Sequence, residues 1–166
     1  IDKYVFVGDS RYVGMSAYEE DEDTFIAKNN MGYAYLEEQM ELIKESCDKN
    51  TALIIGLGVN DLKYSRQKYI DTINEMAQDM DCHIFYMLVN PVDEKKEEQH
   101  GYSVENDVID DFNSVMEEEL SSDVRIIDTN SYLKEEGFET VDGLHYDRST
   151  YKLIYDYIKE CVNKAE

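Results

Sequence analysis

The feature that most constrains the fold is an alternation of short apolar runs with longer segments of helical periodicity. The apolar runs have the length of buried strands and lie at residues 4–7, 25–27, 52–57, 84–89 and 124–127. Apolar side chains recur at helical spacing in residues 31–47, 64–80, 104–120 and 149–162, and a short helix is expected after Ser10. Strands that alternate with helices predict a parallel sheet with helices on both faces. We therefore expect an α/β protein, built as a three-layer α/β/α sandwich around a five-stranded parallel sheet.

The chain is expected to form a single domain over residues 1–166. This length is sufficient to bury a substantial core, 42% of the residues are hydrophobic, and there is only one Pro. No internal repeat or linker is visible. The longest apolar runs, such as residues 52–55, are far shorter than the roughly 20 residues that span a bilayer, so no membrane insertion is expected.

The charge of the chain argues against nucleic acid as a partner. The formal net charge is −22, and there is no stripe of Lys and Arg that could contact phosphates. The cysteines Cys47, Cys82 and Cys161 are far apart and form no CxxC pair. We therefore expect isolated thiols and no zinc site.

Polar residues with catalytic potential stand where predicted strands end. Ser10 follows the first strand, Asn60 follows the third, and Asp142 and His145 follow the fifth. The carboxyl ends of parallel strands share one edge of a sheet, so these residues could meet in one cleft. A serine becomes a nucleophile when a base such as histidine takes its proton, and a carboxylate can orient that histidine. Each residue also has a structural explanation, as a helix cap or a turn residue, but together they predict a hydrolytic triad.

Further candidates surround this triad. The amide of Asn60 and the backbone N–H of Gly32 could donate to an oxyanion, although both residues also suit turns. Arg11 could pair with an anionic substrate group or form a surface salt bridge.

Several tyrosines lie near these motifs and could line a sugar-binding cleft, or could be ordinary tyrosines in a chain that contains 14 of them. They are Tyr12, Tyr33, Tyr35, Tyr102 and Tyr146. The charged segment 91–103 would border the same cleft and could act as a lid.

At these motifs the chain resembles the SGNH hydrolase family, also called the GDSL esterase/lipase family. Gly8-Asp9-Ser10 matches the first block, with Arg11 in place of the Leu of the family name, as in a bacterial GDSR-type branch. Gly32 is the best match to the second block, residues 58–61 match the G-x-N-D block, and residues 142–145 match the D-x-x-H block. The resemblance spans nearly the whole chain and implies the flavodoxin-like SGNH hydrolase fold.

The resemblance also implies a mechanism. Ser10 is then the nucleophile, His145 the base and Asp142 its orienting acid, while the oxyanion hole consists of Ser10, Gly32 and Asn60. No metal or organic cofactor is needed. Small members of the family resemble carbohydrate esterases that remove acetyl groups, so a serine esterase acting on an acetyl ester of a carbohydrate or cell-wall glycan is expected.

Two alternatives stay open at this point. One is an O-acyltransferase with the same triad, and the other is a catalytically silent glycan-binding domain of the same fold. We expect a monomer or weak homo-oligomer that acts outside the cell or in the cell envelope of a bacterium, with its export signal outside this sequence.

Overall fold

The computed structural model describes residues 1–165 and contains a five-stranded sheet in which every neighbouring pair is parallel. The strand order is β2-β1-β3-β4-β5, as in flavodoxin-like folds. The strands are β1 (Lys3–Gly8), β2 (Asp23–Ala27), β3 (Thr51–Gly56), β4 (His83–Met87) and β5 (Val124–Ile127). All five expected strands are therefore confirmed.

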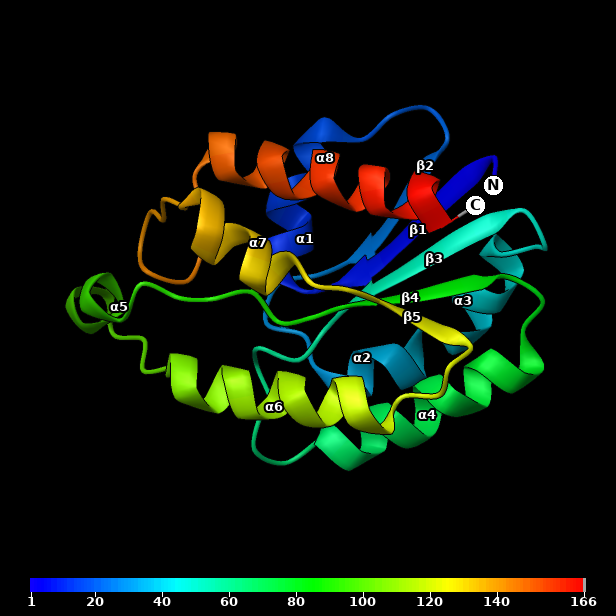
Figure 1. Cartoon of the computed structure of the whole chain (residues 1–166), viewed down its shortest axis with the longest axis horizontal. Coiled ribbons are helices and arrows are strands. Elements are labelled where there is room, and N and C mark those ends of the chain that lie inside the picture. The colour runs from blue at the N-terminus through cyan, green and yellow to red at the C-terminus, as the bar shows by residue number, and fades with distance from the viewer. Residues whose placement is uncertain (166) are drawn as a thin grey trace.

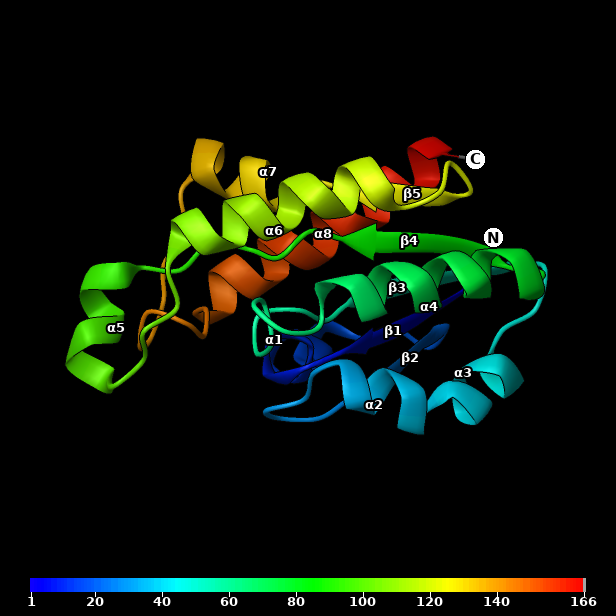
Figure 2. The ribbon, with the colours of Figure 1, turned by 90° about the horizontal axis from the view of Figure 1, so that it is seen from below.

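Helices cover both faces of this sheet, which confirms the three-layer sandwich (Figure 1). One face carries α1 (Ser10–Met15), α7 (Thr129–Glu136) and α8 (Arg148–Ala165), with a short 3-10 helix η1 (Ser16–Tyr18) after α1. The other face carries α2 (Tyr33–Glu38), α3 (Met40–Ser46), α4 (Arg66–Asp79) and α6 (Asn106–Glu119). A further helix, α5 (Glu94–His100), projects beyond the carboxyl ends of the strands (Figure 2).

The helices differ from the expectation in three places. No helix is expected at residues 129–136, where α7 lies. The expected helix at residues 31–47 is broken at Gln39, whose backbone leaves helical geometry (φ −94°, ψ 3°), into α2 and α3. The segment expected as a charged loop contains α5, which begins at the side-chain cap of Asp93 and ends at Gly101 with a left-handed φ of 81°. An N-cap carboxylate and a left-handed glycine are the usual limits of a short helix, even where an apolar stripe is missing.

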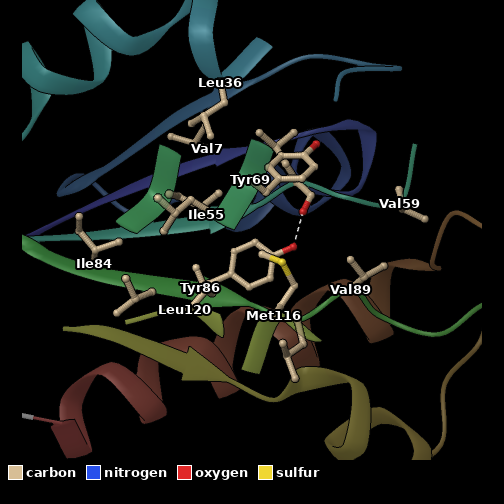
Figure 3. Packing of buried hydrophobic residues seen from close by; sticks show 14 of the residues in the cluster. Val7, Leu36, Ile55, Val59, Tyr69, Ile84, Tyr86, Val89, Met116 and Leu120 are labelled. Atoms are coloured by element: carbon tan, nitrogen blue, oxygen red, sulfur yellow. Dashed lines mark hydrogen bonds between the residues drawn. The ribbon is translucent and has the colours of Figure 1, made fainter. Parts of the chain in front are cut away.

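Alternate side chains of the strands point to opposite faces, and each face packs on its own apolar cluster. Val5 and Val7 of β1 face the cluster beneath α4 and α6, while Phe6 faces α1 and α8. The first cluster includes Tyr69 and Tyr86, both fully buried (Figure 3). Because both faces are covered, β1 and β3 are apolar along nearly their whole length, as central parallel strands usually are.

All three cysteines are free thiols and half-buried. Cys47 and Cys82 lie close to the amino ends of β3 and β4, and Cys161 lies on α8. None of the helices in residues 1–165 has the length and hydrophobicity that a membrane-spanning segment needs.

Candidate active site

Three side chains form a hydrogen-bonded chain at the carboxyl edge of the sheet. Ser10 is the first residue of α1 and follows β1 directly, so its side chain stands at this edge. Its Oγ lies 3.0 Å from Nε2 of His145, and Nδ1 of His145 lies 2.6 Å from Oδ2 of Asp142. The structure thus brings together the serine, histidine and aspartate that the sequence analysis singled out, although Ser10 and His145 are 135 positions apart.

The carboxylate of Asp142 is held in its ionised form. Its burial opposes the charge, but its oxygens accept hydrogen bonds from the imidazole and from two backbone N–H groups, which keeps its pKa below the usual value. Those N–H groups belong to His145 and Leu144 and lie 2.7 and 2.9 Å from Oδ1. An ionised carboxylate at Nδ1 favours a proton there and leaves Nε2 as the acceptor that faces Ser10.

The amide of Asn60 stands beside the same edge, in the segment that follows β3. Its Nδ2 donates to the carbonyl of Met31 at 2.9 Å, which fixes the orientation of the amide. A side-chain amide has two N–H donors, so the second one is available to a ligand. β1 and β3 lead to Ser10 and Asn60 and are neighbours in the sheet at the point where the strand order reverses. Ligands of open parallel sheets bind at this switch point.

The carboxylate of Asp61 joins the segment after β3 to the start of α2. Its Oδ2 accepts the backbone N–H of Tyr33 at 2.8 Å, and its Oδ1 accepts the hydroxyl of Tyr69 at 2.7 Å. Gly32 lies against this carboxylate so closely that a Cβ at its position would be 2.6 Å from Oδ2. Only glycine fits there, so the identity of Gly32 follows from the close approach of Asp61.

Arg11 does not have either of the roles expected for it, and this corrects the sequence analysis. It is only 5% exposed, and its guanidinium donates to three backbone carbonyls. Nε donates to Leu144 at 3.0 Å, Nη1 to Asn90 at 2.8 Å and Nη2 to Pro91 at 3.1 Å. The guanidinium also lies 4.9 Å from the ring centre of Tyr146. Arg11 therefore ties the helix that carries Ser10 to the segment that carries His145, and it reaches neither solvent nor substrate.

Three of the expected cleft tyrosines belong to the interior instead. They are Tyr12, Tyr35 and Tyr146, which are at most 8% exposed, so a substrate cannot reach their rings. The hydroxyl of Tyr12 donates to the sulfur of Met87 and that of Tyr146 to the carbonyl of Pro91. The expectation of substrate contact is therefore wrong for these three side chains.

Tyr33 is only partly buried and lines a pocket between α2, α3 and α4. Its hydroxyl lies 2.6 Å from Oγ1 of Thr72 on α4. A contact of Tyr33 with the substrate stays a prediction.

Tyr102 does reach the site. Its ring meets the imidazole of His145 edge to face, with ring centres 5.9 Å apart, and 38% of the residue is exposed. Tyr102 follows α5, so the segment 91–103 borders the site as expected.

This segment is docked on the loop of His145 through hydrogen bonds to backbone carbonyls of that loop. The N–H of Asp93 donates to the carbonyl of Gly143 at 2.8 Å, and Nζ of Lys96 donates to that of Thr140 at 2.7 Å. A Cβ at Gly143 would lie 2.4 Å from the backbone nitrogen of Glu97, and its φ of 93° also favours glycine. The second residue of the D-x-x-H block is thus a glycine because α5 packs directly against it.

Asp9 caps α1 and is a second carboxyl group near the nucleophile. It is 2% exposed, and its Oδ1 accepts the backbone N–H of Arg11 at 3.0 Å. Burial raises the pKa of Asp9 to about 6, while the hydrogen bond and the charge of Arg11 act in the opposite direction. No group of three or more His, Cys, Asp or Glu side chains within residues 1–165 is arranged to hold a metal ion.

Comparisons with known proteins find similarity in structure and not in sequence. No family model matches this chain, and no curated protein matches its sequence. A GDSL-like lipase from Bacteroides thetaiotaomicron is similar with a TM-score of 0.77 at 17% identity, over 99% of this chain and 89% of that one. A lipase/acylhydrolase from Enterococcus faecalis gives 0.71 at 13% identity, over 98% and 96% of the two chains.

A third similar structure is the C-terminal catalytic domain of peptidoglycan O-acetyltransferase A from Streptococcus pneumoniae. It gives a TM-score of 0.70 at 16% identity, over 99% of this chain and 94% of that one. The protein therefore has the α/β fold of the GDSL, or SGNH, hydrolases. At these identities the likeness concerns the fold, so the activity has to be argued from the site.

Proposed function

We propose that the protein is a serine esterase of the SGNH type that hydrolyses an acyl ester, with acetyl as the acyl group, on a carbohydrate or cell-wall glycan. The observation that carries the proposal is the continuous chain Ser10–His145–Asp142, with contacts of 3.0 and 2.6 Å, at the carboxyl edge of the sheet. A structural role for Ser10 does not call for this chain, because Asp9 already provides the side-chain cap of α1.

The reaction follows from the position of each atom. Nε2 of His145 takes the proton of Ser10 as Oγ attacks the ester carbonyl, and Asp142 stabilises the imidazolium that forms. The imidazolium returns the proton to the leaving alcohol oxygen, which leaves the acyl group on Ser10. Water then attacks the acyl-enzyme with His145 again as base, so that the acid is released and the serine hydroxyl is restored.

The oxyanion would be bound by three donors that belong to different segments. They are the backbone N–H of Ser10 at the start of α1, the backbone N–H of Gly32 and the free N–H of the Asn60 amide. The bond from Asn60 to Met31 supports this assignment, because a donor that is already oriented needs no reorganisation as charge develops.

A second candidate function is acyl transfer to a sugar hydroxyl. It is supported by the likeness to a peptidoglycan O-acetyltransferase domain over nearly the whole of both chains. Both reactions pass through the same acyl-enzyme, and they differ only in whether water or an alcohol attacks it.

The test compares wild type with Ser10→Ala on p-nitrophenyl acetate, acetylated xylan and O-acetylated peptidoglycan. Ser16→Ala is the matched control, because Ser16 caps the other end of the same helix and its hydroxyl donates to the carbonyl of Val13. Turnover should disappear in Ser10→Ala and persist in Ser16→Ala. Equal turnover by Ser10→Ala and wild type would exclude the serine mechanism. Product that forms only when an acceptor alcohol is added would favour transfer.

A further inference from the structure

A groove of about 210 Å³ opens beside the proposed oxyanion donor Asn60. One wall consists of residues 59–64, which follow β3, and the other consists of residues 103–105 together with Val108 of α6. The groove is smaller than the roughly 300–1,000 Å³ of sites that hold drug-sized ligands. It therefore has room for a single small ring and not for a long acyl chain.

The position of the groove indicates which half of an ester it would receive. The leaving alcohol accepts its proton from His145, so the alcohol lies on the histidine side of the reacting carbonyl. The ring of Tyr102 packs on the imidazole of His145, and the next residue, Ser103, begins one wall of the groove. The wall thus continues from the catalytic histidine, which places the alcohol part of the substrate in the groove.

The side chains of the groove match one kind of alcohol. Tyr64 is 88% exposed and offers an uncovered aromatic face. Val59 and Leu62 contribute apolar side chains to the lining of the groove, and Lys63 and Glu105 contribute charged ones. A pyranose ring has the corresponding surfaces, since its C–H face packs on an aromatic ring and its hydroxyl edge bonds to polar groups.

We propose that this groove binds the sugar ring that carries the ester, with the side chain of Tyr64 as its aromatic platform. The proposal rests on the esterase function proposed above. It assigns Tyr64 to substrate recognition and leaves the chemical step to the triad.

The test measures KM and kcat of wild type, Tyr64→Ala and Tyr64→Phe on two substrates, acetylated xylobiose and methyl acetate, whose alcohol part has no ring to stack on Tyr64. Tyr64→Ala should raise KM for the acetylated sugar by roughly tenfold, because it removes the platform, and should leave both constants for methyl acetate unchanged. Tyr64→Phe keeps the ring and should behave as wild type on both substrates.

The outcomes separate this inference from the proposed function. If wild type hydrolyses neither substrate, the esterase function fails and the inference fails with it. If wild type is active and Tyr64→Ala leaves KM for the sugar ester unchanged, the inference alone is overturned. An equal loss on both substrates would also overturn it, since it would mean that Tyr64 supports the segment that holds Asn60.

Discussion

Replacing Gly32 by alanine should disable the oxyanion hole while the triad stays in place. The new Cβ would lie 2.6 Å from Oδ2 and 2.8 Å from Cγ of Asp61, where real Cβ atoms essentially never approach. Either the carboxylate or the backbone of Gly32 must therefore move by roughly half an ångström. The carboxylate cannot move freely, because it accepts the N–H of Tyr33 at 2.8 Å and the hydroxyl of Tyr69 at 2.7 Å. The backbone of Gly32 is thus expected to share the displacement.

The size of the effect follows from what this backbone would do. Loss of one oxyanion donor typically lowers kcat by about 10²–10³-fold, which corresponds to roughly 3 kcal/mol in the activation barrier. The cost in folding is smaller. A stretched bond between Asp61 and Tyr33 is worth about 1–2 kcal/mol of unfolding free energy. The variant should therefore remain folded at 25 °C and be nearly inactive.

The assay combines hydrolysis of p-nitrophenyl acetate with thermal denaturation. Gly137→Ala is the control, since its φ of 89° strains an alanine while no atom lies within 4 Å of the new Cβ. This control should lose about 1–2 kcal/mol of stability and keep its kcat. If kcat of Gly32→Ala stayed within about threefold of wild type, a change below 1 kcal/mol, Gly32 would not be an oxyanion donor.

Three further substitutions test other parts of the site. Arg11→Lys replaces the guanidinium, which donates to three carbonyls, by a single ammonium group. The variant should have a lower kcat, and its unfolding free energy should fall by about 3 kcal/mol. An unchanged melting temperature would contradict this. Asp142→Asn should lower kcat by about 10⁴-fold without changing the circular dichroism spectrum, and a loss below about tenfold would exclude Asp142 as the orienting acid. Burial raises the pKa of Asp9 from 3.8 to about 6. As the pH rises, the Asp9 carboxyl therefore loses its proton in the unfolded chain before it does so in the folded protein, which favours unfolding. Wild type should lose up to about 3 kcal/mol of unfolding free energy between about pH 4 and pH 6. Asp9→Asn has no carboxyl group to ionise at this position, so urea denaturation should show its unfolding free energy rising relative to that of wild type between pH 4 and pH 7. If the difference in unfolding free energy between the two proteins did not change with pH, the raised pKa of Asp9 would be refuted.

The fold could be predicted from the sequence because its signals are local. Each expected strand overlaps one that exists, and even the short run at residues 25–27 lies inside β2. The helix α5 was missed because residues 94–100 are nearly all charged or polar and show no apolar stripe. Its limits were nevertheless readable, since Asp93 and Gly101 are a typical cap and a typical terminator.

The environment of Arg11 could not be predicted for a different reason. The sequence shows a cation beside Ser10, and a cation suggests an anionic partner. The actual partners are the carbonyls of Asn90, Pro91 and Leu144, and a backbone carbonyl is present at every position, whatever the residue type.

The geometry of the triad depends on one local and one long-range device, and they control different distances. Asp142 and His145 belong to one short loop, and bonds within that loop set the angle of the imidazole. The distance from the imidazole to Ser10 has no such local support. Arg11 supports it directly, because Arg11 is adjacent to Ser10 and donates to the carbonyl of Leu144, adjacent to His145. A change at Asp142 should therefore alter the tautomer and the orientation of the His145 imidazole. A change at Arg11 should instead alter the distance between Nε2 of His145 and Oγ of Ser10. Both changes should lower kcat, because proton transfer from Ser10 to His145 needs the correct tautomer as well as the correct distance.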